Sequence, residues 1–159
     1  MIRRRLRLAI ALVAGLTATA AVGAPGTSQA PDPPPGTPAP PHVIHEIQQS
    51  LHDAVRRFDA MDPAGVLAHV SDRYRTGPLT KPLLAEQLRA IFALHDQVKA
   101  QVRIDEVRLV GDHAWVYSTG GVSGRVRWIG SSVPVLSWER ELEVARREDG
   151  RWRLFGYQQ

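Results

Sequence analysis

The stretch VKAQVRIDEVRLV, residues 98–110, decides the fold class of this chain. Between residues 98 and 104 every second residue is apolar, which is the period of a half-buried β-strand. The alternation changes parity at residues 105–106, because Val107 is the next apolar residue, and such a slip predicts a β-bulge or bend in one long strand. Upstream of this stretch apolar residues recur at helical spacing, so the sequence changes here from helices to strands.

Three helices are predicted upstream of this strand. Residues 42–59 place apolar side chains at three- and four-residue steps, which predicts an amphipathic helix with one buried stripe. Asp62 suits the N-cap position of a helix and Pro63 suits its first helical position, so the pair predicts a short second helix. Thr80 is expected to cap a third helix, whose apolar stripe runs to Phe92.

Three further strands are predicted downstream, at residues 113–119, 135–146 and 152–157. The Glu-Asp-Gly run at residues 148–150 is typical of a tight hairpin turn, and Trp152 is expected to anchor the last strand against the first helix. One face of the middle strand is predicted to carry Leu136, Trp138, Leu142 and Val144. Helices followed by consecutive antiparallel strands predict an α+β fold, with the helices packed on one face of a curved sheet.

A glycine-rich segment, Gly120-Gly121-x-x-Gly124, follows the first of these downstream strands. A dinucleotide-binding fingerprint would have to open a helix at this point, and this segment does not. It is therefore interpreted as a flexible hairpin connection.

The N-terminus has the pattern of a secretory signal peptide over residues 1–24. Arginines open it, an apolar run follows over residues 8–16, and small residues close it. Cleavage is expected near Ala20 or Gly23, which predicts a periplasmic or secreted protein that meets the membrane only transiently, through this peptide. The alternative is an uncleaved anchor, although the apolar stretch is at the lower limit for crossing ~30 Å of hydrocarbon.

Residues 25–41 hold 8 of the 12 prolines of the chain. They offer almost no apolar side chain to bury, so they predict a disordered, extended linker. A proline-rich ligand for a partner domain is the alternative. The predicted folded domain is then residues 42–159.

Charge and cysteine content exclude several classes of function. The signal segment contains Arg3, Arg4, Arg5 and Arg7, and without them 16 basic residues balance 16 acidic ones. The sequence pI of about 10.1 therefore belongs to the targeting segment, and no basic excess remains for binding nucleic acid. The absence of cysteine excludes disulfides, thiolate metal sites and a cysteine nucleophile.

Neither a metal nor a cofactor is predicted. Three histidines lie on or beside the first helix, namely His42, His45 and His52. Two of them are separated by two helical turns, about 10.5 Å of rise, which is too far for one ion. The spacing of His42 and His45 also differs from the i, i+4 spacing of helical zinc sites.

The sequence resembles the nuclear transport factor 2-like superfamily, and within it the SnoaL-like branch. The likeness is carried by PAGVLAHV at 63–70 leading into SDRY, by GDHAWVYSTG at 111–120, and by REDGRWRLFGYQ at 147–158 with its Gly-x-Trp-Arg ending. It extends over residues 42–159 and implies a cone-shaped sheet around helices, with a pocket at the wide end. The superfamily includes isomerases, dehydratases, cyclases and non-enzymatic binding domains, so the fold alone leaves the function open.

The resemblance implies that catalysis would need two acid–base side chains across the pocket. The candidates singled out are His95, which extends the inner stripe of the third helix, and Tyr74, between the second and third helices. The wider set of candidates is His69, Asp96, His113, Trp115 and Tyr117. The alternatives are a histidine that closes a helix end and an ordinary half-buried tyrosine. Together with Phe92 and Trp138, His95 and Tyr74 are predicted to line an apolar ligand pocket.

Trp115 and Tyr117 lie on the strand parity opposite to Ala114 and Val116. Large aromatics on an outer sheet face are typical of an interface, which predicts a homodimer; lining of a pocket is the alternative.

The predicted function is the binding of a small hydrophobic molecule or a partner segment in the cell envelope, without demonstrable catalysis. The alternatives are a lyase or isomerase that uses His95 and Tyr74, and a pure protein–protein interaction module. These classes differ in whether two titratable side chains face each other across an open pocket.

Overall fold

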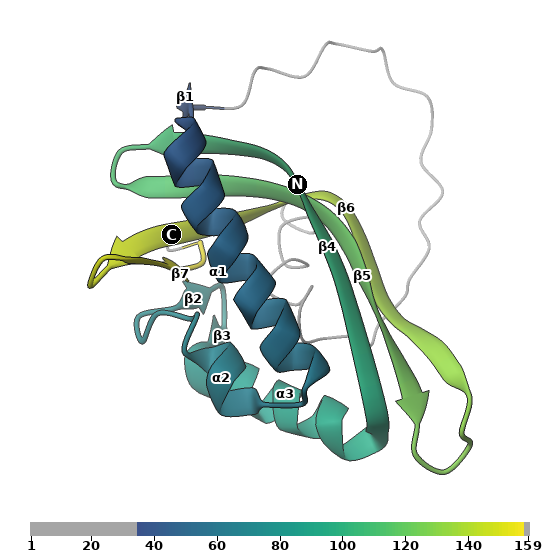
Figure 1. The fold of residues 1–159 in the computed structure, drawn as a ribbon. Coiled ribbons are helices and arrows are strands. Elements are labelled where there is room, and N and C mark those ends of the chain that lie inside the picture. The colour runs from purple at the N-terminus through teal and green to yellow at the C-terminus, as the bar shows by residue number, and fades with distance from the viewer. Residues whose placement is uncertain (1–34, 158–159) are drawn as a thin grey trace, which may run out of the picture.

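The computed structural model describes residues 35–157 (Figure 1). The predicted signal peptide and residues 25–34 of the predicted linker lie outside the described residues, as do residues 158–159. Within residues 35–157, no helix has the length and apolar character needed to cross a membrane.

Three helices form where the apolar periodicity predicts them: α1 (Pro41–Asp59), α2 (Pro63–Leu67) and α3 (Lys81–Leu94). Asp62 caps α2, because its Oδ1 accepts a hydrogen bond from the Gly65 amide at 2.9 Å. Thr80 occupies the N-cap position of α3 but makes no side-chain hydrogen bond there. The three helices are confirmed, and α1 begins one residue earlier than predicted.

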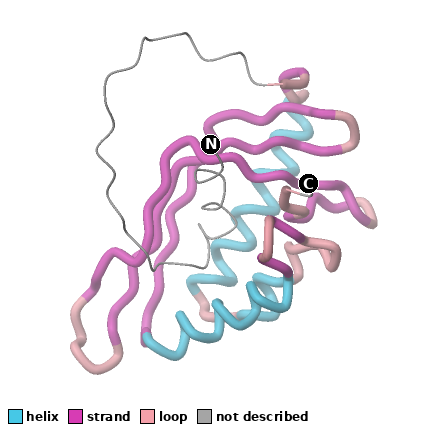
Figure 2. Tube along the Cα trace, turned by 180° about the vertical axis from the view of Figure 1, so that it is seen from behind, coloured by secondary structure: helices cyan, strands magenta, loops and turns pink. Residues whose placement is uncertain are grey.

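In the part of the chain that the structure describes, one antiparallel sheet of five strands, in the order β1-β4-β5-β6-β7, curves around the helices. Its strands are β1 (Thr37–Pro38), β4 (His95–Val110), β5 (His113–Val126), β6 (Ser132–Glu148) and β7 (Arg151–Leu154). A small second sheet pairs β2 (Arg75–Thr76) with β3 (Leu79–Thr80). Figure 1 shows α1 lying across the concave face of the sheet, and Figure 2 shows the sheet from the other side. The predicted α+β fold is confirmed.

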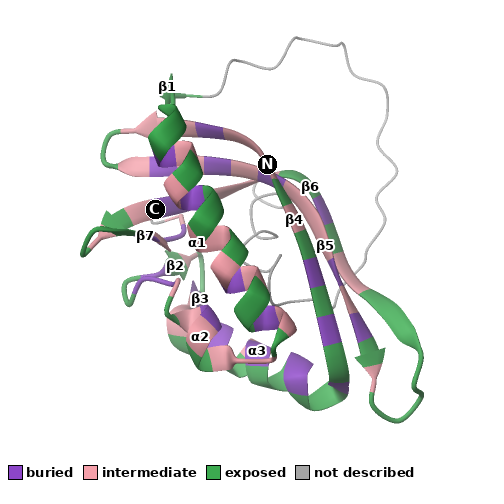
Figure 3. Ribbon diagram, viewed as in Figure 1, coloured by how far each residue is buried: buried purple, intermediate pink, exposed green. Residues whose placement is uncertain are grey.

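The hydrophobic core fills the space between the helices and the concave face, where the buried segments in Figure 3 lie. One cluster includes Phe58, Leu88 and Val98, which are at most 1% exposed. The other lies against the first half of α1 and contains Ile47 and Trp152. Trp152 therefore anchors β7 against α1, as the sequence predicts.

The last seven residues of the predicted linker are part of the fold, which corrects the linker boundary. Strand β1 pairs with the end of β4. Ala39 is buried, and its amide donates a hydrogen bond to the carbonyl of Val107 at 3.0 Å. The guanidinium of Arg108 donates to the carbonyls of Pro35 and Gly36. A proline-rich segment can dock in this way because an edge strand tolerates residues without an amide proton.

Strand β4 contains the bulge that its change of parity predicts. Ile104 pairs with Ser118 and Glu106 pairs with Tyr117, so Asp105 is the extra residue between two consecutive pairs. The bulge returns the apolar residues of the second half of β4 to the concave face.

Strand β6 contains a second bulge, which the sequence analysis did not predict. Arg140 has a positive φ of 43°, and the pairing with β5 shifts register beside it. Trp138, upstream of the bulge, is buried on the concave face, whereas the alternation is reversed downstream of it. The prediction that one face carries Leu136, Trp138, Leu142 and Val144 is therefore wrong, because the last two lie on the convex face.

Gly120 and Gly124 lie inside strand β5, so the predicted flexible connection is wrong. A Cβ atom on Gly120 would come within 2.6 Å of the Trp138 ring, and one on Gly124 within 2.4 Å of the His95 ring. Glycine is needed at both positions because a neighbouring ring lies directly over the strand. The turn of this hairpin is instead at residues 127–131.

Candidate functional site

A cavity of about 140 Å³ lies between α1 and the concave face of the sheet. Its wall is mainly apolar, and the contributing apolar residues are Ile47, Leu51, Ala54, Val66, Val70, Val102, Val116, Trp138, Ala145, Trp152 and Leu154. Five further wall residues have polar or charged side chains: Ser50, His69, Ser118, Glu143 and Arg153. An apolar hollow with a few placed polar groups is the usual composition of a small-molecule site.

Glu143 reaches the cavity because of the bulge in β6. It pairs with Val116, which also lines the cavity, whereas unbroken alternation past Arg140 would turn its side chain to the convex face. Burial raises the pKa of Glu143 well above its ordinary value of 4.5, and the neighbouring Glu141 raises it further. The neutral acid, which can donate a hydrogen bond, therefore persists here to a higher pH than on an exposed glutamate.

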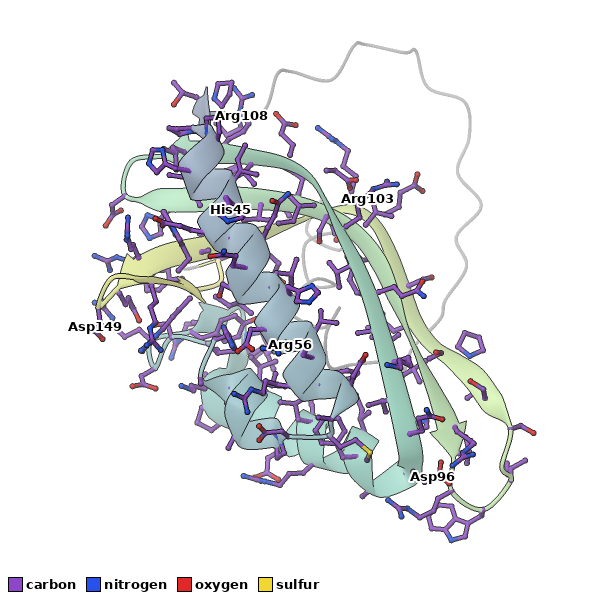
Figure 4. The ribbon with its side chains drawn as sticks, viewed as in Figure 1. His45, Arg56, Asp96, Arg103, Arg108 and Asp149 are labelled. Atoms are coloured by element: carbon purple, nitrogen blue, oxygen red, sulfur yellow. The ribbon has the colours of Figure 1, made fainter. Side chains whose placement is uncertain are left out.

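His69 borders the cavity and makes hydrogen bonds through both ring nitrogens. Nε2 lies 2.9 Å from Asp53 Oδ2, and Nδ1 lies 3.0 Å from Ser50 Oγ. Ser50 and Asp53 are three residues apart on α1, so the helix presents both to His69. The hydrogen bond from His69, assisted by Arg56 (labelled in Figure 4), lowers the pKa of Asp53. The Ser50 hydroxyl also donates to the carbonyl of Trp152 at 3.1 Å.

The three hydrogen bonds of the Ser50–His69–Asp53 network are satisfied together only when His69 carries both ring protons. Ser50 has one hydroxyl proton and gives it to the Trp152 carbonyl, so Nδ1 must supply the proton shared with Oγ. Nε2 must supply the other, because the Asp53 carboxylate only accepts. When His69 is neutral, Ser50 can turn its proton to Nδ1. The hydrogen bonds of the network therefore fit both the neutral and the doubly protonated form of His69, as the site of an acid–base group requires.

A larger hollow of about 640 Å³ adjoins the cavity. The two share the wall residues Ser50, His69, Trp152 and Arg153. Charged side chains border the larger hollow, among them Glu46, Asp53 and Arg57.

The four residues predicted to line a pocket occupy different places. Trp138 lines the cavity, and its Nε1 donates to Ser118 Oγ at 3.1 Å. Tyr74 and Phe92 are buried in the hydrophobic core and do not line the cavity. Burial also raises the pKa of Tyr74, with the carboxylate of Glu143 adding to the effect.

His95 is 6% exposed and does not line the cavity either. It is the C-cap residue of α3, and its Nδ1 lies 2.8 Å from the carbonyl of Ile91. This is the helix-closing alternative named in the sequence analysis. The structure does not bring His95 and Tyr74 together at the cavity, so the prediction of an acid–base pair made by these two residues has no geometric support.

Trp115 and Tyr117 lie on the convex face, opposite to the cavity. The Trp115 ring is 5.6 Å from the ring of Tyr157, and the Arg140 guanidinium lies 5.2 Å from the Tyr117 ring. Both predicted interface residues are half-buried within the chain itself. Trp115 and Tyr117 therefore do not line this cavity, which was the alternative interpretation. The homodimer stays a prediction.

The part of the chain that the structure describes contains no cluster of metal-ligating side chains. Residues 35–157 contain no group of three or more His, Cys, Asp or Glu side chains placed to hold an ion. His69 and Asp53 supply two donors, and Ser50 occupies the other ring nitrogen of His69.

The sequence indicates His69 as a candidate, but it does not indicate the partners of His69 or the role of Glu143. The spacing of Ser50 and Asp53 on one face of α1 was visible, but nothing local indicated that His69 would dock against that face. Glu143 lies in a strand whose simple alternation assigns it to the wrong side.

Solved structures share this fold over most of their length. A conserved protein from Planctomyces limnophilus matches with a TM-score of 0.63 and 14% identity, covering 72% of this chain and 92% of that protein. A ketosteroid isomerase-like protein from Erwinia carotovora atroseptica matches with a TM-score of 0.58 and 21% identity, covering 73% and 93%. A protein of the nuclear transport factor 2-like family from Streptomyces avermitilis matches with a TM-score of 0.57 and 13% identity, covering 74% and 94%.

No protein-family model matches the sequence, and no curated protein matches it either. At these identities the structural matches establish the fold alone. The chain has the nuclear transport factor 2-like fold that its sequence resembles.

Proposed function

We propose that this chain, with its nuclear transport factor 2-like fold, binds a small, largely apolar molecule in the cavity beside His69. The observation that carries the proposal is an apolar cavity of about 140 Å³ with two titratable side chains, Glu143 and His69, in its wall. The signal-peptide pattern of residues 1–24 leads us to place this function in the cell envelope.

The size and chemistry of the cavity define the class of ligand. An apolar cavity of ~150 Å³ in another protein accommodates benzene, so this one suits a group of about one ring. Burial raises the pKa of Glu143 and so favours its neutral carboxyl. A neutral carboxyl can donate a hydrogen bond, so the ligand is expected to carry an acceptor such as a carbonyl or ether oxygen. Larger substituents have room in the adjoining hollow.

The test combines ligand retention with a filled cavity. Native mass spectrometry of protein purified from its own host would detect a retained molecule. In vitro, cyclohexanone serves as a one-ring probe with a carbonyl acceptor. Ala54→Leu adds three carbons from α1 into the cavity, and Ala93→Leu makes the same change at an exposed position of α3.

Cyclohexanone is expected to raise the Tm of the wild type and of Ala93→Leu, and to leave that of Ala54→Leu unchanged. Equal shifts in all three proteins, or no shift in any of them, would contradict binding in this cavity.

A second candidate is an enzyme that transfers a proton within the bound molecule. It is favoured by two acid–base side chains that border the same cavity: His69, which is hydrogen-bonded to Asp53, and Glu143, whose pKa is raised by burial. The check is NMR of the retained ligand in D2O. Exchange of a ligand C–H that disappears in His69→Gln would support catalysis, and a ligand that binds without any exchange would leave binding as the function.

A further inference from the structure

The hairpin between β5 and β6 ends in the most exposed large apolar side chains of the described residues. Trp128 is 76% exposed and Ile129 is 73% exposed. Figure 1 shows this hairpin projecting beyond the end of α3, and Figure 3 shows its end as exposed. We call residues 127–133 the hairpin tip. Exposed aromatic and aliphatic side chains at one projecting point mark a contact surface.

The tip is held in place by hydrogen bonds, so the exposure belongs to a defined structure. The Val126 amide donates to the Ser131 carbonyl at 3.0 Å, and the Gly130 amide donates to the Val126 carbonyl at 2.8 Å. Gly130 has a positive φ of 71°, which glycine adopts without strain. The backbone amide of Arg127 donates to the Leu94 carbonyl at 3.1 Å and so fastens the tip to the end of α3.

Further apolar surface adjoins the tip. Leu94, which accepts the hydrogen bond from Arg127, is 49% exposed, and Val133 on the returning strand is 38% exposed. The apolar residues therefore come from the hairpin and from the end of the neighbouring helix.

Acidic side chains are absent from the parts of both strands that adjoin the tip of this hairpin. Residues 113–138 contain no Asp or Glu. Arg125 pairs with Asp96, labelled in Figure 4, whose carboxylate lies 2.8 Å from the Arg125 Nε. Arg127 lies within the tip, and its guanidinium donates to the carbonyls of Phe92 and His95 at the end of α3. The tip thus carries a basic residue and no acidic one.

We propose that the hairpin tip inserts Trp128 and Ile129 into the surface of a membrane that contains anionic lipids. Tryptophan suits the interface between headgroups and acyl chains, because its ring is apolar and its N–H is polar. Arg127 complements anionic headgroups beside it. A second protein copy fits this surface less well, since a stable protein interface uses about 20–30 residues per side. This contact is distinct from the transient one expected of residues 1–24.

The chain contains no cysteine, which allows a probe at a single position. Ile129→Cys in the full chain is labelled with an environment-sensitive fluorophore. Leu83→Cys is the matched control, because Leu83 is also an exposed apolar residue, 48% exposed, but lies at the opposite end of α3. Because the readout is local, binding of the N-terminal segment to vesicles does not by itself produce the signal.

With vesicles of phosphatidylcholine and phosphatidylglycerol, the label at position 129 is expected to shift its emission to the blue, and the label at position 83 is not. The shift is expected to shrink on pure phosphatidylcholine, and also when Trp128→Ala is added to the labelled chain. No shift at 129, or equal shifts at both positions, would overturn the proposal. A shift at 129 that depends on protein concentration and needs no vesicles would assign the tip to self-association and would also overturn it.

Discussion

Glu143→Gln is expected to stabilise the fold by an amount that grows with pH. In the unfolded chain this carboxyl titrates near its ordinary value of 4.5, and in the folded chain burial raises its pKa well above that value. Between the two pKa values the folded state holds a proton that the unfolded state has released. The free energy of unfolding therefore falls as the pH rises, by about 1.4 kcal/mol per pH unit. Below the lower pKa both states are protonated, and the contribution of Glu143 is fully present.

Glutamine keeps the shape and the neutral hydrogen-bonding character of the protonated acid but does not titrate. Urea unfolding from about pH 4 to about pH 7 measures the difference between variant and wild type. The difference is expected to be smallest at the acid end and to increase by up to ~1.4 kcal/mol per pH unit.

Glu139→Gln, at an exposed position of the same strand, is the control and should show no such increase. A difference for Glu143→Gln that stays constant across this pH range would refute the argument that the carboxyl is buried beside the cavity.

Three other perturbations test the packing of the domain and the predicted homodimer. A chain that begins at His42 loses β1 and buried Ala39, so its Tm should fall by several degrees in a thermal melt; an unchanged Tm would show that the segment does not dock. Trp152→Ala should cost ~3–5 kcal/mol in urea unfolding, because the side chain is 9% exposed and packs on α1, and a loss below ~1 kcal/mol would contradict that packing. Trp115→Glu should dissociate the homodimer predicted from Trp115 and Tyr117, as measured by light scattering at micromolar concentration. A monomeric wild type would contradict the predicted homodimer.

The fold was predictable because its signals are local and repeated. The helical stripe of residues 42–59 and the cap at Asp62 each determine one element without reference to the rest of the chain. The parity slip at residues 105–106 likewise located the bulge of β4. The edges of the fold were less predictable. Residues 35–41 dock as an edge strand through backbone groups, which apolar periodicity does not report.

The site was less predictable because it depends on contacts between distant segments. His69 becomes part of the Ser50–His69–Asp53 network only when its segment docks against the Ser50 and Asp53 face of α1. His95 had the inward position that a catalytic residue needs, but the helix end provided a carbonyl that occupies its ring nitrogen. The sequence correctly predicts that His95 is buried. Its role follows from its hydrogen-bond partner, the Ile91 carbonyl, which the sequence pattern does not identify.

The placement of Glu143 depends on a link between the two bulges. The Thr119 hydroxyl on β5 donates to Asp105, the extra residue of β4, at 2.6 Å, and accepts from the backbone amide of Arg140 at 2.9 Å. A hydroxyl can do both at once, so one residue of the central strand fixes an irregularity in each neighbour. The β4 bulge visible in the sequence thus continues across the sheet to Arg140, where it reverses the alternation and turns Glu143 into the cavity. Alternation considered one strand at a time cannot detect this, because the information lies in hydrogen bonds that connect three different strands.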